Sequence, residues 1–185
     1  MARAGAEADE DDIERWSGAH SSADPDAAAG YPGAPSSGDG GVAMQVIHAR
    51  TAPRPVGAYA HARRVGDLLF VAGIGPRVPA DDSIPGGPIR DKDGKPLPYD
   101  IKAQTRQCIE NVRAVLRESG CDLRDVFDVQ VFLTDMKADF KAFNEVYTEY
   151  FQDIQATRTT VQVEALPTPI AVELKVIAKV PEPTA

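Results

Sequence analysis

The chain has 185 residues, of which 43% are hydrophobic, and a formal net charge of −8 at neutral pH. This length predicts one main domain whose hydrophobic core is large enough to be stable without disulfides or bound metals. The excess of acidic side chains disfavours nucleic acid as a partner, because binding to phosphates needs a basic surface. No apolar run in the sequence is long enough to span a membrane. The two cysteines and three histidines show no metal-ligand spacing. We therefore expect a cytoplasmic protein that contains no metal.

The N-terminal segment differs from the rest in charge and composition. Residues 1–45 contain nine acidic and two basic side chains, a charge of −7, which leaves −1 for residues 46–185. The segment is rich in Gly, Ala, Ser and Pro, so it has too little apolar surface to order itself. We predict a disordered acidic tail over 1–45, with a partner-binding segment as the alternative. Residues 182–185 are expected to be a flexible C-terminus.

The folded part, residues 46–181, begins with three predicted strands. Gln45–Arg50 has the composition of a first strand. Tyr59–Val65 and Leu68–Gly73 flank Gly66-Asp67, a pair that is typical of a tight hairpin turn. Residues 76–100 are rich in proline and glycine, which indicates a long loop. Long loops inside compact domains are often functional.

Two amphipathic helices with a strand between them follow this loop. Asp100 can cap a helix that runs through Ser119, because apolar residues recur there at steps of three and four. Alternating side chains predict a strand over Val126–Leu133. After Asp135, a second helix is indicated by an aromatic stripe, formed by Phe140, Phe143, Tyr147, Tyr150 and Phe151.

The last two predicted strands are Arg158–Leu166 and Ile170–Val180. The order β-β-β-α-β-α-β-β indicates a two-layer α+β domain whose two helices cover one face of a sheet. Alternation places Glu173 and Ile177 on the face opposite Leu174. Apolar residues on that uncovered face, such as Ile177 and Leu166, predict contact with another subunit.

Two charged residues in these strands are candidates for chemistry. Arg158 lies among hydroxyl side chains, and a guanidinium on a rigid strand can bind a carboxylate through two parallel hydrogen bonds. The other interpretation is a surface arginine on an edge strand. Glu173 interrupts an apolar strand, where it could orient a water or transfer a proton. A salt bridge with Lys175 or Lys179 is the other interpretation for this residue.

Five motifs stand out along residues 46–181. They are Val56-Gly-Ala-Tyr59, Leu69-Phe-Val-Ala-Gly73, Phe143-Asn-Glu-Val-Tyr147, Arg158-Thr-Thr-Val161 and Val172-Glu-Leu-Lys-Val-Ile-Ala178. Together they resemble the motifs of the Rid family of enamine/imine deaminases. The resemblance implies a chorismate-mutase-like fold, with a six-stranded mixed sheet backed by two helices. It also implies a homotrimer with a central β-barrel, active sites in clefts between subunits, and no cofactor.

The same resemblance assigns roles to individual residues. Arg158 would clamp the carboxylate of a small enamine or imine acid, and Glu173 would place the attacking water. Tyr59, Asn144 and Thr160 would bind the substrate, since they stand at pocket positions of the family. Many members have cysteine where this chain has Thr160.

Within the family, the chain is similar to 2-aminomuconate deaminases, which act in the degradation of aromatic compounds. The similarity lies in Gly86-Gly-Pro-Ile-Arg-Asp91, Asp100-Ile-Lys-Ala-Gln-Thr-Arg106 and Ala156-Thr-Arg-Thr-Thr160. The expected reaction converts 2-aminomuconate and water to 2-oxo-3-hexenedioate and ammonia. The far carboxylate needs a second cation, for which Arg77 and Arg90 are candidates. The alternatives are a housekeeping deaminase of 2-iminobutanoate and 2-iminopropanoate, and a non-catalytic ligand-binding or regulatory trimer.

Overall fold

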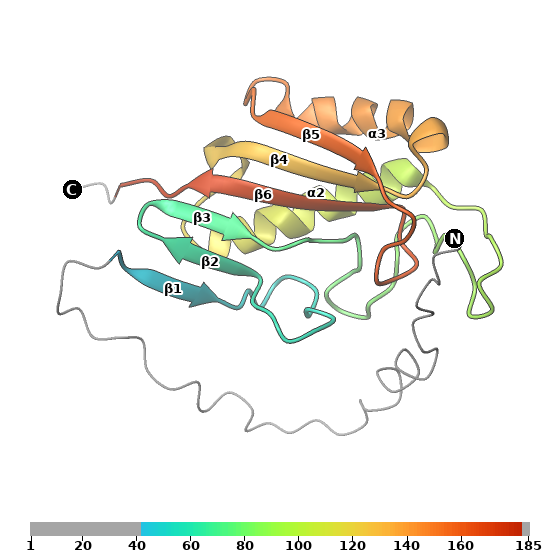
Figure 1. Ribbon diagram of the computed structural model, residues 1–185, viewed down its shortest axis with the longest axis horizontal. Helices are drawn as coiled ribbons and strands as arrows, with labels where there is room; N and C mark the ends of the chain where they lie inside the picture. The colour runs from blue at the N-terminus through green and yellow to red at the C-terminus, as the bar shows by residue number, and fades with distance from the viewer. Residues whose placement is uncertain (1–41, 183–185) are drawn as a thin grey trace, which may run out of the picture. The chain divides into compact units, whose positions relative to one another are not determined.

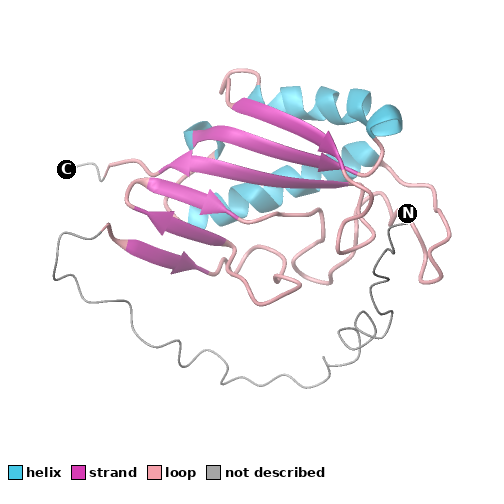
Figure 2. Ribbon diagram, in the orientation of Figure 1, coloured by secondary structure: helices cyan, strands magenta, loops and turns pink. Residues whose placement is uncertain are grey.

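The computed structural model describes residues 42–182, which form one mixed sheet backed by two long helices (Figure 1). Figure 2 shows both helices on the same side of the sheet. Most of the predicted acidic tail and of the predicted C-terminal segment lies outside the described residues. Neither helix is long and apolar enough to cross a bilayer. The elements are β1 (Met44–Ile47), β2 (Ala62–Val65), β3 (Leu68–Val71), α2 (Ile101–Glu118), a 3-10 turn η1 (Leu123–Asp125), β4 (Val126–Leu133), α3 (Met136–Phe151), β5 (Thr157–Gln162) and β6 (Val172–Lys179).

Both helices begin at the capping residues that the sequence indicates. The Asp100 side chain accepts hydrogen bonds from the backbone N–H groups of Lys102 and Ala103, and the Asp135 side chain accepts one from Ala138. These bonds satisfy donors that the first turn of a helix leaves free. Gly120 follows α2 with a φ of +75°, a conformation that favours glycine. The predicted helices are confirmed.

The strands pair in the order β1-β2-β3-β6-β4-β5. β2 and β3 form an antiparallel pair, as the hairpin signal predicts, and β1 pairs antiparallel with β2. β4 and β5 run parallel, because α3 carries the chain back along the sheet between them. β6 is inserted between β3 and β4 and is antiparallel to both. The last strand therefore lies in the middle of the sheet, and β5 forms one edge.

The core lies between the helices and one face of the sheet. Val129 and Val131 of β4, Leu174 of β6, and Cys108 and Ile109 of α2 are completely buried. Cys108 is thus a small core residue. The opposite face carries exposed large apolar side chains, as predicted, and these include Val46, Phe70 and Val161.

Five strands are shorter than expected. β5 ends at Gln162, β1, β2 and β3 cover four residues each, and β6 covers only Val172–Lys179. Leu166, which was expected on the uncovered face, lies in the loop after β5 and is buried. Tyr59 precedes β2 instead of lying within it. Prolines near these strand ends, including Pro167 after β5, cannot donate the hydrogen bonds that a strand pair needs.

The long loop 76–100 is fixed by polar side chains of α2. The Gln104 amide is fully buried; its Nε2 donates to the Gly87 carbonyl and its Oε1 accepts from the Ala171 N–H, each at 2.8 Å. Asn111 Nδ2 donates to the carbonyls of Gly75 and Arg77. The loop therefore has a defined path over the helix.

The Gln104 contacts predict a large loss of stability for Gln104→Ala. The buried Ala171 N–H and the partly buried Gly87 carbonyl would lose their partner, at a cost of about 1–3 kcal/mol each. Urea unfolding should show a free energy of unfolding about 2–6 kcal/mol lower than that of the parent protein. Gln107→Ala is the matched control, because Gln107 bonds only to Asn111 on its own helix. Equal losses in the two variants would contradict the bridging role of Gln104.

Candidate active site

Arg158 lies on β5 with its guanidinium against one face of α3. Its central carbon is 4.5 Å from the ring centroid of Tyr147 and 5.8 Å from those of Phe140 and Phe143. Its Nη1 donates to Asn144 Oδ1 at 2.9 Å. These four residues recur at helical steps of three and four, so they share one face of α3. Arg158 is therefore held in place, which a loose surface arginine would not be.

Glu173 lies on β6, and its side chain is on the sheet face away from the helices. Its carboxylate sits directly over Gly73, where an added Cβ would be only 2.8 Å from Glu173 Cδ. Burial raises the pKa of the Glu173 carboxyl above its usual value. Among the described residues it forms no salt bridge with Lys175 or Lys179, and Lys179 instead lies 3.9 Å from Asp67. Glu173 is thus a partly buried carboxylate without a cationic partner.

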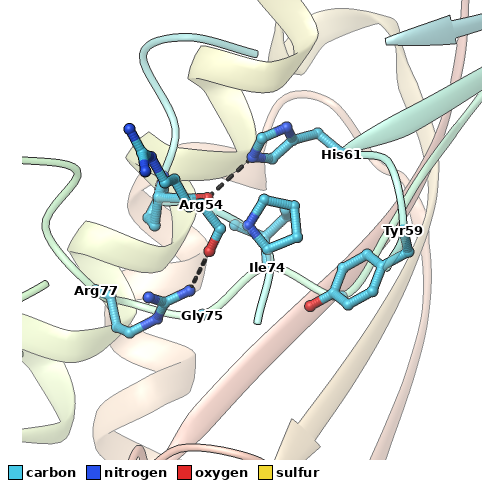
Figure 3. A pocket seen from close by; sticks show the side chains of 9 residues that line it. Arg54, Tyr59, His61, Ile74, Gly75 and Arg77 are labelled. Carbon is cyan, nitrogen blue, oxygen red and sulfur yellow. Dashed lines mark hydrogen bonds between the residues drawn. The ribbon is translucent and has the colours of Figure 1, made fainter. Parts of the chain in front are cut away.

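A small pocket lies beside Gly73 and is shown in Figure 3. Its volume is about 30 Å³, which is enough for an ordered water. Tyr59 borders it on one side and Arg77 on the other. The pocket is lined by Pro53, Arg54, Pro55, Tyr59, His61, Gly73, Ile74, Gly75 and Arg77. A four- to six-carbon acid would extend beyond this pocket of a single chain.

His61 fixes the loop that forms one wall of this pocket. Its Nδ1 accepts a hydrogen bond from the Ala49 N–H at 3.0 Å, so Nδ1 carries no proton. The proton is then on Nε2, which lies 2.9 Å from the Pro53 carbonyl and donates to it. His61 is buried and acts as a neutral bridge between two loop segments.

The two arginines expected to bind a second carboxylate differ in their surroundings. Arg77 uses both terminal nitrogens, since Nη1 donates to Asp82 and Nη2 to the Arg54 carbonyl. Arg90 donates only to the Leu166 carbonyl, at 3.3 Å. Arg54 also lines the pocket, and its guanidinium makes no hydrogen bond or ion pair within residues 42–182. Arg54 carries no sequence motif that would have predicted this position.

The other residues that were expected to bind substrate lie in two places, beside Arg158 and beside the Gly73 pocket. Asn144 and Thr160 lie beside Arg158, on α3 and on the same face of β5. The hydroxyls of Thr160 and Tyr147 are buried without a hydrogen-bond partner among the described residues. Tyr59 lies with Gly73 on the other side, 46% exposed and free to contact a ligand or another chain.

The structure does not bring Arg158 and Glu173 together within one chain. Arg158 is paired with Val129 of β4 and Glu173 with Phe132, three residues further along the same strand. Positions three apart on a strand point to opposite faces and are separated by about 10 Å along it. β4 also lies between the two strands, which adds about 10 Å across the sheet. A small substrate therefore cannot contact Arg158 and Glu173 of the same polypeptide at once.

Comparison with known proteins gives a consistent result. The family model described as Endoribonuclease L-PSP matches residues 49–180. A RutC family protein of Pyrococcus abyssi is 39% identical over 137 residues, which cover 74% of this chain and 98% of the relative. An Escherichia coli K12 protein named reactive intermediate deaminase TdcF is 32% identical over 137 residues, covering 72% and 95% of the two chains.

Solved structures show the same fold. A crystal structure of E. coli TdcF with bound serine has a TM-score of 0.61 and 32% identity, covering 73% of this chain and 98% of that one. A Thermotoga maritima structure has a TM-score of 0.63 and 32% identity, covering 73% of this chain and 96% of that chain. The sheet of six strands with two helices is thus the fold of these relatives.

The contact of Glu173 with Gly73 predicts the effect of Gly73→Ala. The added methyl group would push the carboxylate off the backbone and into water, because the two cannot occupy the same space. Loss of burial should lower the pKa of Glu173 toward the ordinary value of about 4.3. NMR titration of the labelled glutamate carboxyl in both proteins measures this shift. An unchanged pKa would contradict the proposed cause.

Proposed function

The chain belongs to the Rid family, and on that premise we propose that it is a cofactor-independent hydrolytic deaminase of enamine and imine carboxylates. The observation that carries the proposal is the fixed guanidinium of Arg158 on the edge strand. Two features of TdcF support it: its name, reactive intermediate deaminase, and the serine bound in its crystal structure. Serine has the carboxylate and the adjacent nitrogen-bearing carbon that such a substrate would have.

Arg158 would bind the substrate carboxylate. Asn144 occupies Nη1, so Nε and Nη2 remain for a side-on pair of hydrogen bonds. Charge-assisted hydrogen bonds of this kind contribute about 1.5–3 kcal/mol each. The anchored carboxylate places the neighbouring carbon, which bears nitrogen, at a fixed distance from the guanidinium.

The reaction then needs one water and no redox partner. An enamine first gains a proton on carbon and loses one from nitrogen, which gives the imine, the stronger electrophile. Glu173 orients a water and accepts one of its protons as the oxygen bonds to carbon. Glu173 passes that proton to nitrogen, the hydroxyl proton of the adduct then moves to nitrogen, the C–N bond breaks, and ammonia leaves as the carbonyl forms. The raised pKa makes Glu173 a better base, and the carboxylate must be ionised for this step.

We further propose that the site is shared between two chains of a homotrimer. Arg158 and Glu173 face opposite sides of one sheet, and the substrate would extend beyond the pocket beside Gly73. The apolar, uncovered sheet face supports association with further copies. In this arrangement Arg158, Asn144 and Thr160 come from one chain, and Glu173 with Tyr59 from its neighbour.

Two substrate classes remain for this site. The loop with Arg90, together with the unpaired Arg54, supports a dicarboxylate such as 2-aminomuconate. The relatives named reactive intermediate deaminase support small imines such as 2-iminobutanoate, the housekeeping alternative. The net charge of −8 disfavours RNA, although the family model carries the word endoribonuclease.

Subunit mixing tests the shared site. Arg158→Ala and Glu173→Gln should each reduce ammonia release from a freshly generated imine by more than tenfold, because each removes one half of the site. Co-expression of the two variants in equal amounts should restore activity to about a quarter of the parent level, since one site in four then combines two intact halves.

The same experiment distinguishes a site that lies within one chain. If both residues acted from the same chain, every site in the mixture would lack one of them, and activity would stay at the level of the single variants. Unchanged turnover by Arg158→Ala alone would remove Arg158 from the mechanism. Absence of ammonia release by the parent protein itself would favour the non-catalytic alternative. A mixture of Arg158→Ala with itself, prepared in the same way, controls for assembly.

A substrate panel tests the second carboxylate site. Arg90→Ala and Arg54→Ala should lower kcat/KM for 2-aminomuconate by about tenfold or more and that for 2-iminobutanoate much less, because only the dicarboxylate needs the extra cation. Arg124→Ala is the control, since this arginine is exposed on η1. Equal losses on both substrates would contradict the dicarboxylate assignment.

A further inference from the structure

The position of Arg158 depends on α3 as well as on its own strand. An arginine side chain has several rotatable bonds, so its backbone position alone does not fix the guanidinium. Two contacts fix it here, the stacking on the Tyr147 ring and the hydrogen bond to Asn144. Both partners lie on α3, three residues apart, and thus on one face of the helix.

Tyr147 is the nearest aromatic ring to this guanidinium. The 4.5 Å separation is within the range of a favourable cation–π contact, and the rings of Phe140 and Phe143 are further away. The Tyr147 ring is also stacked on the Phe151 ring, at 4.4 Å between the centroids and with planes 9° apart. Phe151 is buried, so this second contact limits the movement of the Tyr147 ring.

The hydroxyl of Tyr147 does not explain why a tyrosine ring is held there. It is buried and has no hydrogen-bond partner among the described residues. A buried hydroxyl without a partner costs free energy, so it does not stabilise the fold. The identifiable interactions of Tyr147 are therefore made by its ring, which contacts the Arg158 guanidinium and the Phe151 ring.

We propose that Tyr147 is a positioning residue for substrate binding, whose ring holds the Arg158 guanidinium with its Nε and Nη2 groups free for a carboxylate. This inference rests on the proposed function, because it takes Arg158 as the carboxylate receptor. With the Tyr147 ring against the guanidinium and Asn144 on Nη1, the donors without a partner among residues 42–182 are Nε and Nη2, which lie along one edge of the guanidinium. A planar anion with two oxygens is the ligand that matches this edge.

The test compares Tyr147→Leu with Tyr147→Phe and Phe151→Leu in the assembled, full-length protein. The probe is 2-oxobutanoate, the keto acid that hydrolysis of 2-iminobutanoate would produce, and its Kd is measured by titration calorimetry. Tyr147→Leu should raise Kd, and KM for the imine, about tenfold, because the ring face is lost. Tyr147→Phe should leave Kd close to that of the parent protein, since it keeps the ring and removes only the hydroxyl.

Phe151→Leu is the matched control for a purely structural role. It removes the other ring of the stack, so it should lower the melting temperature about as much as Tyr147→Leu does. It should leave Kd nearly unchanged, because Phe151 is separated from the guanidinium by the Tyr147 ring. Equal increases of Kd in both leucine variants, or an equal loss with Tyr147→Phe, would overturn the proposal.

A double-mutant cycle covers the case in which Tyr147→Leu folds poorly. Lysine lacks the planar group that stacks on the ring, so in an Arg158→Lys background Tyr147→Met should change Kd much less than it does with Arg158 present. Identical changes in the two backgrounds would contradict the proposal. Arg158→Ala separates it from the proposed function: if that variant bound 2-oxobutanoate as tightly as the parent, the carboxylate receptor itself would be wrong.

Discussion

The stacking of Arg158 on the aromatic face of α3 is the interaction on which the site depends. It joins the edge strand β5 to a helix that follows β4 in the chain and covers the sheet. Because β4, α3 and β5 form one parallel unit, the guanidinium and its partners come from neighbouring stretches of sequence. The result is a cation that is held on one side and free on the other. Such a group can bind a carboxylate without first losing much side-chain entropy.

The sheet order explains why this cation does not meet Glu173 in its own chain. β6 lies on the far side of β4, and its Glu173 projects from the other face of the sheet, above Gly73. Under the proposed function, a single chain would supply two half-sites with different chemistry. One half would be the anion receptor at Arg158, and the other the Glu173 carboxylate, whose pKa is raised by burial. A second copy of the chain is the simplest element that could complete each half, and the apolar open face of the sheet is a suitable contact surface.

The rigid loops around Gly73 give the second half its shape. His61 and Arg77 each hydrogen-bond a carbonyl of the Pro53–Arg54 segment, and Gln104 and Asn111 hold the long loop against α2. These polar side chains therefore use their hydrogen bonds to hold backbone carbonyls in place. Arg77 is an example of a residue whose charge suggests ligand binding but whose contacts are structural. Arg54 and Arg90 remain the cations with donors to spare.

The sequence by itself determined the elements and the candidate chemistry. Capping aspartates and steps of three and four residues specify α2 and α3, and alternation specifies β4 and β6, because these signals act between near neighbours in the chain. The motifs around Arg158 and Glu173 identified the two charged residues. Only the tertiary structure decided the insertion of β6 beside β4, the early end of β5, the burial of Leu166, and the stacking of Arg158 on Tyr147. These features depend on contacts between distant segments, whose free energy is set by the packing of the whole domain and leaves no local pattern in the sequence.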